Sequence, residues 1–349
     1  MTRRAVVLGG NGLIGVAATA ALARDGWEVT LVHRGSRPLD AELGPFGVRE
    51  VIGDAHDPDV LRAAVGSGTD VVVDVVAMRA EHARAVQGLD VGSAVVISSA
   101  AVYATDDGRP LLGDDHPPPP LPVTEGQRVV EADGETYAGG KVELEEAWLA
   151  CPVPATLLRA GAIHGPRATN PREWFALKRV LDGRRDVVLA HDGASRFQPV
   201  AAANLAELVR LAAANPGDRV LNGGDPSAPT VADIVRRVYG VVGAEVRVHP
   251  MAGPAVAGLG ASPWGLPWPF VLDMSAAERE LGYRAVTSYD DALPGEIDWM
   301  REVTASQDWR EAFPTFAWVD SQTPQFDYAA EDAWIADQGA PAETPGAER

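Results

Sequence analysis

The feature that most restricts the fold of this chain is a glycine-rich turn directly after its first apolar run. Residues 5–8 (AVVL) are typical of a buried strand, and residues 9–15 (GGNGLIG) lead into an alanine-rich helix. Glycine at Gly9 permits a tight turn, Gly12 lets the backbone approach a ligand, and Gly15 lets the helix pack closely. Because the helix N-terminus offers free N–H groups and a partial positive charge, the turn predicts a pyrophosphate site.

Beyond the turn, short β-branched runs alternate with helical patterns through the first half of the chain. The expected strands cover residues 5–8, 28–32, 48–53, 70–77, 94–98 and 155–158, and the expected helices cover residues 13–25, 59–65 and 137–150. Such alternation predicts an α/β fold with a Rossmann-type doubly wound parallel sheet. Residues 105–134 are proline-rich and without periodicity, so we expect a long loop there.

The second half of the chain is less regular, and we expect a smaller C-terminal α/β lobe that binds substrate. The expected domains are a dinucleotide-binding domain over residues 1–166, the smaller lobe over residues 167–337 with segments that cross back to the sheet, and a tail over residues 338–349. The tail lacks large apolar side chains and is therefore expected to be disordered.

Charge and composition exclude several classes of partner. A formal net charge of −19 disfavours nucleic acid and anionic membrane, because phosphate binding needs a positive field. The single cysteine, Cys151, cannot form an internal disulfide, and no run approaches the ~20 apolar residues of a membrane helix. We therefore expect a cytoplasmic protein with a small-molecule substrate. The seven histidines show no metal-ligand spacing, so no metal is expected.

The end of the second expected strand bears on the choice of dinucleotide. An NAD-specific site places an acid there to accept from the ribose 2′-OH. Residues 31–37 (LVHRGSR) contain no acid and two arginines, and a guanidinium pairs well with a 2′-phosphate. This pattern predicts NADP(H), with Arg34 as the main ligand and Ser36 and Arg37 as helpers, while NAD(H) remains an alternative. His33 is interpreted as a surface residue.

A tyrosine and a lysine at positions i and i+4 form a candidate proton-transfer pair. Tyr137 and Lys141 belong to YAGGK (residues 137–141) and lie on one face of an expected helix. A neighbouring ammonium stabilises phenolate and lowers the pKa of a tyrosine. A hydride transfer at a carbinol needs a matched proton transfer, which the phenol supplies.

These motifs together resemble the extended short-chain dehydrogenase/reductase family, which includes sugar-nucleotide epimerases and dehydratases. The resemblance rests on the GxxGxxG turn, on SSAAVY (residues 98–103), on the YxxxK pair and on LRAGAIHGP (residues 158–166). It implies that Ser99 hydrogen-bonds the reacting oxygen, that Tyr137 is the acid and base, and that Lys141 also contacts the nicotinamide ribose. The implied catalytic residues are therefore Ser99, Tyr137 and Lys141.

The same resemblance implies a set of cofactor contacts. An aspartate in a GDxxD context contacts adenine in the family, which points to Asp54 in GDAHD. The full set of implied cofactor-binding residues is Gly9, Gly12, Leu13, Ile14, Gly15, Arg34, Asp54, Ala77, Tyr137, Lys141, Ala160 and Ile163. The family also implies a homodimer through the helix of residues 137–150 and the one over residues 79–87.

Departures from the family pattern bear on the reaction. Ala162 replaces an asparagine that contacts the diphosphate of sugar nucleotides, and His164 replaces a tyrosine. Ala100 and Ala101 replace the acid pair of the dehydratases, which disfavours water elimination. The favoured hypothesis is an NADP(H)-dependent oxidoreductase of the carbonyl reductase or alcohol dehydrogenase type, acting on a small organic substrate.

Two alternatives stay open. The first is an NAD-dependent sugar-nucleotide epimerase, which uses the same triad. The second is a non-enzymatic dinucleotide sensor or RNA-associated member, since the chain around residues 29–35 resembles the branch that includes chloroplast stem-loop RNA-binding proteins. Outside the triad, Asp74 and Tyr103 are expected to have structural roles, and His116 is expected to be exposed.

Overall fold

The computed structural model describes residues 2–339, and the chain forms two compact units. The first unit consists of Met1–Ala168, Arg196–Pro229 and Trp268–Trp299, and the second consists of Thr169–Ser195, Thr230–Pro267 and Met300–Arg349. The lobe predicted over residues 167–337 therefore divides between the two units.

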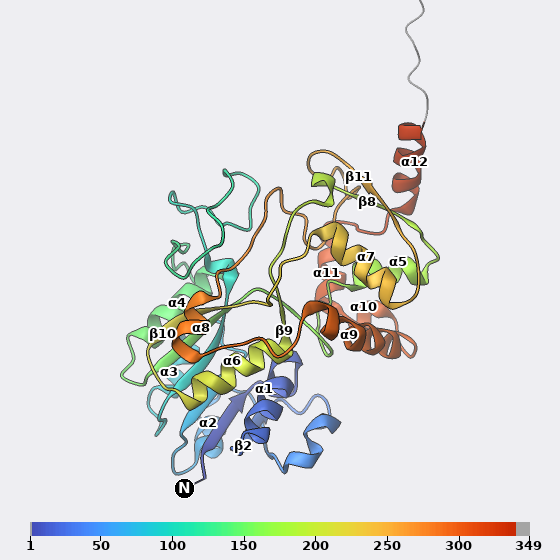
Figure 1. The fold of residues 1–349 in the computed structure, drawn as a ribbon. Coiled ribbons are helices and arrows are strands. Elements are labelled where there is room, and N and C mark those ends of the chain that lie inside the picture. The colour runs from blue at the N-terminus through green and yellow to red at the C-terminus, as the bar shows by residue number, and fades with distance from the viewer. Residues whose placement is uncertain (1, 340–349) are drawn as a thin grey trace, which may run out of the picture. The chain divides into compact units, whose positions relative to one another are not determined.

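The first unit is built on a seven-stranded sheet whose neighbouring strands are all parallel (Figure 1). In spatial order the strands are β10 (Arg219–Gly223), β6 (Ala155–Ala160), β5 (Ala94–Ser99), β4 (Val71–Asp74), β1 (Arg4–Leu8), β2 (Glu28–His33) and β3 (Arg49–Ile52). The prediction of a doubly wound parallel sheet is confirmed. The chain order reverses at β1, which pairs with both β2 and β4, and ligands of such sheets bind at the carboxyl ends of the strands beside this point.

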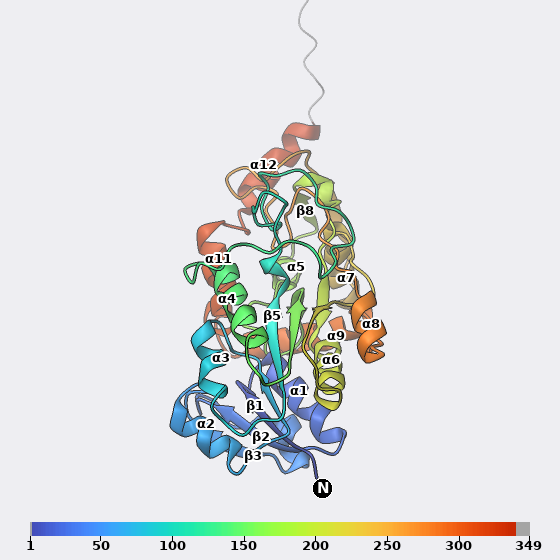
Figure 2. The ribbon, with the colours of Figure 1, turned by 90° about the vertical axis from the view of Figure 1, so that its left-hand side faces the viewer.

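Helices cover both faces of the sheet, as Figure 2 shows. One face packs against α1 (Leu13–Arg24), α6 (Ala202–Ala214) and α8 (Ser275–Leu281), and the other against α2 (Pro58–Val65), α3 (Ala80–Val86) and α4 (Tyr137–Leu149). The strands alternate between the two cores: Ala5 and Val7 of β1 face α1, whereas Val6 and Leu8 face the opposite helices. A strand with both faces covered reads as a continuous apolar run, which is why the sequence pattern was informative.

Smaller elements complete the first unit. They are the 3₁₀ turns η1 (Ala41–Phe46) and η2 (Ala100–Val102), and the short parallel pair β7 (Ala162–His164) and β9 (Pro199–Ala201). Helix α9 (Tyr289–Thr304) begins in this unit and ends in the second.

Two local predictions in the first unit are wrong. Strand β4 ends at Asp74 rather than Ala77, because the Asp74 carboxylate accepts hydrogen bonds from the backbone N–H groups of Val76 and Ala77 and turns the chain. His116, expected to be exposed, is buried, since its ring packs 4.6 Å from the ring of Trp268. The long segment of residues 105–134 contains no helix or strand, as expected for a loop.

The second unit contains short helices and one parallel strand pair. Its elements are α5 (Trp174–Leu181), β8 (Asp186–Leu189), η3 (His191–Gly193), α7 (Val231–Val241), β11 (Arg247–Pro250), α10 (Trp309–Ala312), α11 (Pro314–Gln322) and α12 (Tyr328–Gly339). Strand β8 pairs with β11. Helix α12 extends through Gln338 and Gly339, where the tail predicted to be disordered begins. The remaining tail residues, 340–349, lie outside the described residues.

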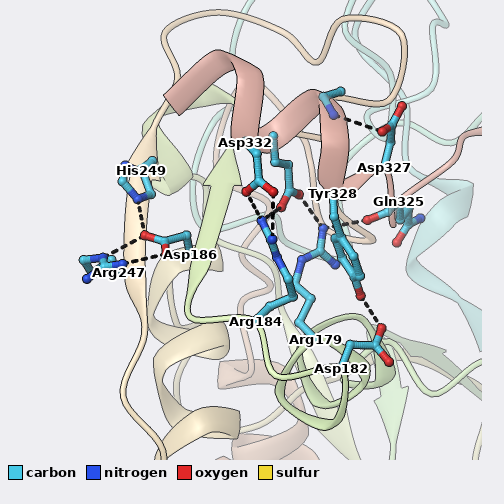
Figure 3. A network of polar contacts seen from close by, with 12 residues as sticks. Arg179, Asp182, Arg184, Asp186, Arg247, His249, Gln325, Asp327, Tyr328 and Asp332 are labelled. Carbon is cyan, nitrogen blue, oxygen red and sulfur yellow. Dashed lines mark hydrogen bonds and ion pairs between the residues drawn. The ribbon is translucent and has the colours of Figure 1, made fainter. Parts of the chain in front are cut away.

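Polar contacts attach α12 to the rest of the second unit (Figure 3). The guanidinium of Arg179 in α5 is 1% exposed, stacks 3.8 Å above the ring of Phe175, and donates to Glu331 Oε1 at 2.7 Å and to the carbonyl oxygen of Gln325 at 2.6 Å. The Tyr328 hydroxyl donates to Asp182 at 2.6 Å. A buried arginine is thereby matched by a buried carboxylate and a carbonyl.

Candidate active site

The glycine turn connects the end of β1 to the start of α1 and has the geometry of a phosphate cradle. Gly9 has a φ of +84°, and a Cβ on Gly15 would lie 2.5 Å from the carbonyl oxygen of Gly9, so both positions require glycine. No described atom lies within 4 Å of a Cβ placed on Gly12. Gly12 is the N-cap of α1, and no described side chain caps the helix. The first N–H groups, those near Leu13 and Ile14, therefore remain available to an anion.

The end of β2 carries the residues predicted to select the dinucleotide. Arg34 is exposed and makes no ion pair with the described residues. Arg37 donates to the backbone oxygen of Asn11 at 3.1 Å, which ties this arginine to the glycine turn. His33 is buried rather than at the surface, because β3 lies beside β2 and brings Glu50 Oε2 to 2.9 Å from His33 Nε2.

Asp54 lies just after β3, exposed to solvent. Its Oδ1 accepts a hydrogen bond from the backbone N–H of His56 at 2.9 Å. The cap of α2 is a different residue, Asp57, which accepts from the N–H groups of Asp59 and Val60. Asp54 is therefore not required as a helix cap, and its predicted contact with adenine stays a prediction.

Lys141 is the most strongly constrained of the predicted catalytic residues. Its side chain is 4% exposed, and Nζ donates to the carbonyl oxygens of Ala77 at 2.6 Å and Ile97 at 2.8 Å. The carbonyl of Ile97 lies near the carboxyl end of β5, and that of Ala77 lies in the loop that follows β4. Burial lowers the pKa of Lys141 to about 8, and the carboxylates of Asp74 and Glu145 oppose part of this shift.

Tyr137 lies at the start of helix α4, and Ser99 lies at the end of strand β5. Tyr137 is the first residue of α4 and is 52% exposed, one helical turn before Lys141. Ser99 ends β5, and its Oγ accepts from the backbone N–H of Ala101 at 3.2 Å. Within residues 2–339, no hydrogen bond joins the three predicted catalytic side chains to one another. Helix spacing places Tyr137 and Lys141 on one face, and their joint action stays a prediction.

A buried ion pair behind these residues was not anticipated from the sequence. Glu145, one turn after Lys141, accepts from Arg159 Nη2 at 2.6 Å and from the Ser98 hydroxyl at 2.5 Å. Glu145 and Arg159 are 3% and 6% exposed. The pair joins α4 to β5 and β6 beneath the catalytic positions. An acid on the sheet-facing side of α4 was the signal that could have revealed it.

Tyr103 is the other tyrosine near these residues, and its surroundings differ from those of Tyr137. It is fully buried, its hydroxyl donates to Asn222 Oδ1 at 2.5 Å, and Arg159 lies 4.9 Å from the centre of its ring. Burial raises the pKa of Tyr103 to about 12, which the nearby Arg159 partly opposes. Tyr103 is therefore unsuited to proton transfer at neutral pH.

The segment from β6 to β7 carries Ala160 and Ile163. Ala160 is 3% exposed at the end of β6, and Ile163 packs with Ile14 against the core on the α1 face. His164, in the position of the family's tyrosine, has Nε2 2.9 Å from Asp225 Oδ2 and Nδ1 3.3 Å from Glu296 Oε2. All three side chains are buried, and no pattern in the sequence indicates that they lie close together.

The structure also bears on dimerisation, metal binding and membrane crossing. Val142, Leu144 and Trp148 of α4, on which the expected dimer partly depends, are buried within the chain, whereas Leu149 is exposed. Among the described residues, no group of three or more His, Cys, Asp or Glu side chains is arranged to hold a metal ion. None of the helices in residues 2–339 combines the length and apolar character that a membrane crossing requires.

Comparison with solved structures identifies the same fold elsewhere. The enzyme WbmG of Bordetella bronchiseptica, in complex with NAD, has a TM-score of 0.66 at 19% identity, covering 86% of this chain and 95% of that chain. UDP-glucose 4-epimerase of Thermotoga maritima, with UDP-glucose, has a TM-score of 0.65 at 16% identity, covering 86% and 99%. At such identities the likeness establishes the fold.

Sequence comparison gives a more specific relation over part of the chain. The chloroplast stem-loop binding protein of 41 kDa b of Arabidopsis thaliana is 27% identical over 187 residues, which span 50% of this chain and 46% of that protein. The chain thus matches less than half the length of this curated relative. Residues 5–90 match the model of the NAD dependent epimerase/dehydratase family. This N-terminal segment is thus similar to the family that the motifs resemble.

Proposed function

We propose that this protein is an enzyme that uses a nicotinamide dinucleotide to act at a carbinol carbon, and that its reaction is the epimerisation of a sugar nucleotide. The observation that carries the proposal is the position of Lys141. Its ammonium is buried against the carbonyl oxygens of Ala77 and Ile97, one helical turn after the half-exposed Tyr137. A buried cation beside an accessible phenol is the arrangement that general acid–base catalysis by tyrosine requires.

The residues of the first unit fit a dinucleotide. The open backbone at Gly12 and the uncapped N-terminus of α1 would receive the pyrophosphate. Arg34, exposed at the end of β2, would face the adenosine ribose, and Lys141 would hydrogen-bond the nicotinamide ribose. When bound, the nicotinamide supplies a hydride acceptor and donor at the substrate carbon.

Each of the three predicted catalytic side chains then has a defined task. Tyr137 removes the hydroxyl proton as the substrate carbon becomes a carbonyl carbon, and returns it when that carbon is reduced on its other face. Lys141 stabilises the phenolate of Tyr137 in the interval. Ser99 donates a hydrogen bond to the same substrate oxygen. Oxidation and reduction balance within one cycle, so no external reductant is consumed.

The comparisons support epimerisation over net reduction. The matching family model is that of epimerases and dehydratases, and one of the similar structures is an epimerase with UDP-glucose. The alanines at positions 100 and 101, in place of an acid pair, weigh against dehydration. Ala162 replaces the asparagine that contacts the diphosphate in many members, so this chain would hold a diphosphate through other groups.

The test uses the purified full-length chain and a panel of nucleotide sugars. Proton NMR should show inversion at one ring carbon without added cofactor, and acid extraction should release NAD in near-stoichiometric amount. A matched sample of Tyr137→Phe should retain the dinucleotide and show no inversion. Failure of the parent to invert any nucleotide sugar, with dinucleotide bound, would count against epimerisation.

A second candidate is an NADP(H)-dependent carbonyl reductase, and Arg34 is the observation that favours it. The strand end where NAD-specific sites carry an acid holds His33, and Glu50 of the neighbouring strand β3 contacts that histidine at 2.9 Å. Arg34 is thus free to meet a 2′-phosphate. Exchangeable NADP(H), and oxidation of NADPH by a carbonyl panel, would support this function instead.

A further inference from the structure

Two histidines lie stacked beside the loop that follows β4. The rings of His56 and His82 are 3.9 Å apart at their centres and 3° from parallel. His56 comes from the turn between β3 and α2, and His82 lies in α3. Both are largely shielded, with side chains 12% and 23% exposed.

Asp74, which contacts His56, and His82 together accept three consecutive backbone N–H groups. His56 Nε2 lies 2.7 Å from Asp74 Oδ2, and Asp74 Oδ1 accepts from Val76 N at 3.0 Å and Ala77 N at 2.8 Å. The next N–H, that of Met78, donates to His82 Nδ1 at 2.9 Å. The conformation of residues 76–78 therefore depends on this cluster.

The loop held in this way touches two parts of the candidate active site. A Cβ on Gly9 would collide with Val76, so the loop packs directly against the glycine turn. The carbonyl oxygen of Ala77 accepts from Lys141 Nζ at 2.6 Å. A continuous set of contacts thus runs from His56 through Asp74 and Ala77 to Lys141.

The hydrogen bonds also fix the protonation state of one ring. Because His82 Nδ1 accepts the Met78 N–H, it carries no proton, so His82 is neutral. Burial lowers the pKa of His82 below its usual range, and the adjacent His56 adds to the shift. The carboxylates of Asp74, Glu81 and Asp54 oppose it. A proton added at Nδ1 would place an N–H donor against the N–H donor of Met78.

We propose that His56 and His82 are positioning residues that hold residues 76–78, and through Ala77 the ammonium of Lys141, in the shape that dinucleotide binding needs. Protonation of His82 releases the Met78 N–H, loosens the loop and weakens dinucleotide binding. The part concerning the dinucleotide rests on the proposed function. The part concerning the loop rests on the contacts alone.

Two substitutions at each histidine distinguish the contribution of its hydrogen bond from that of its ring. His82→Asn keeps an acceptor at the position of Nδ1, whereas His82→Phe keeps a stacked ring and removes the acceptor. His56→Gln keeps a donor at the position of Nε2, whereas His56→Leu removes it. His249→Gln is the control, since His249 also contacts a carboxylate, at 2.7 Å from Asp186, but in the second unit.

The first readout is the dissociation constant for NAD and NADP, measured by calorimetry on the full-length chain from pH 8 down to pH 4.5, because the pKa of His82 lies below its usual range. The parent and the His249→Gln control should lose about tenfold or more in affinity as His82 becomes protonated. His82→Asn should bind well at both pH values, and His82→Phe should bind weakly at both. Restored dinucleotide affinity in His82→Asn would not follow from a merely structural role of the ring. Dinucleotide affinity and a pH profile like those of the parent in His82→Phe would overturn the inference.

The second readout is amide hydrogen exchange at Val76, Ala77 and Met78 without cofactor. His82→Phe and His56→Leu should raise exchange at these amides about tenfold or more over the parent, and His82→Asn and His56→Gln should not. Unchanged rates in the first two variants would overturn the inference. Should the parent bind neither dinucleotide, the proposed function fails, yet this experiment still decides whether the histidines hold the loop.

Discussion

The ammonium nitrogen of Lys141 lies 2.6 Å from the carbonyl oxygen of Ala77, and this contact joins helix α4 to the loop after strand β4. A second contact, 2.8 Å to the carbonyl oxygen of Ile97, joins the same ammonium to β5. A cation held by two neutral carbonyls in a buried place is weakly compensated, which is why its pKa falls. The same place is where a parallel sheet of this order binds its ligand.

The pKa of about 8 for Lys141 predicts an alkaline limit to function. Deprotonation removes the charge that supports the phenolate of Tyr137, so turnover should fall as the pH rises through about 8. The measurement is a pH profile of turnover at saturating substrate. A profile that stays flat to pH 9.5 would show that the charge of Lys141 is not needed.

The same shift predicts a pH dependence of stability with the opposite sign. In the unfolded chain Lys141 stays protonated up to its ordinary pKa of 10.5, whereas in the folded chain it loses its proton near 8. The unfolded state therefore binds more protons between these values, and stability rises with pH there. Urea titrations should show the parent gaining stability relative to Lys141→Met between pH 8 and pH 10.5. Lys178→Met, which removes the lysine paired with Asp182, is the control: it keeps Lys141 and should therefore show the same gain relative to Lys141→Met as the parent.

Removing the proton of Tyr137 should abolish most of the chemistry and little of the binding. Tyr137→Phe keeps the ring, and general acid–base catalysis contributes about 100- to 10,000-fold, so turnover should fall by at least that range at near-parental dinucleotide affinity. Tyr103→Phe is the matched control. It loses the hydrogen bond to Asn222 and about 1 kcal/mol of stability, while turnover should stay within a few-fold of the parent. Equal effects of the two substitutions on turnover would contradict the assignment.

The sheet could be predicted because its signals are local. Each buried strand is a short β-branched run, and each glycine of the turn has a backbone task within a few residues of β1. The YxxxK pair was equally readable, since helical spacing alone puts Tyr137 and Lys141 on one face. For the same reason the family was recognisable from motifs, and the match over residues 5–90 agrees with it.

The groups that were missed depend on contacts between distant residues. Glu145 is buried because Arg159, on another element, supplies its counter-charge, and no sequence pattern pairs the two residues. His33 looked like a surface residue, because its partner Glu50 comes from the next strand. Strand β4 stops early through a side chain that bonds its own following backbone, which periodicity does not register.

Arg34 provides a direct test of cofactor preference. If it pairs with a 2′-phosphate, the parent should bind NADP more tightly than NAD, and Arg34→Ala should weaken NADP binding by on the order of 1–3 kcal/mol. Affinity for NAD serves as the internal control and should change little. Titration of both dinucleotides by calorimetry gives the four constants. Equal affinities in the parent, or a parent that prefers NAD, would remove the basis for the reductase candidate.

Breaking the buried ion pair of Glu145 and Arg159 should lower the free energy of unfolding substantially. Glu145→Gln leaves a guanidinium that is 6% exposed without its charge partner, and breaking a buried ion pair costs about 3–5 kcal/mol. The neighbouring Glu146 is exposed, so Glu146→Gln should change stability by less than about 0.5 kcal/mol. Urea titrations of both variants give the comparison. A loss below about 1 kcal/mol in Glu145→Gln would indicate that water or another group compensates Arg159.

The second unit offers a close comparison, because two adjacent acids of α12 each contact an arginine but differ in burial. Glu331 is 3% exposed and contacts Arg179, which is itself buried, whereas the side chain of Asp332 is 60% exposed and contacts Arg184. An exposed ion pair contributes about 0–1 kcal/mol, since water screens it and ordering the side chains has an entropic cost. Breaking the buried pair leaves the Arg179 charge in an apolar place, at a cost of about 3–5 kcal/mol.

Glu331→Gln should therefore unfold α12 at lower urea concentration and speed amide exchange along it, while Asp332→Asn should leave both near the parental values. Hydrogen exchange resolved by segment is the appropriate measurement, because it reports the opening of α12 apart from the rest of the chain. Similar exchange in the two variants would mean that α12 is held by its apolar contacts, such as Trp334 and Ile335 against Val188 and Met251, rather than by the buried arginine.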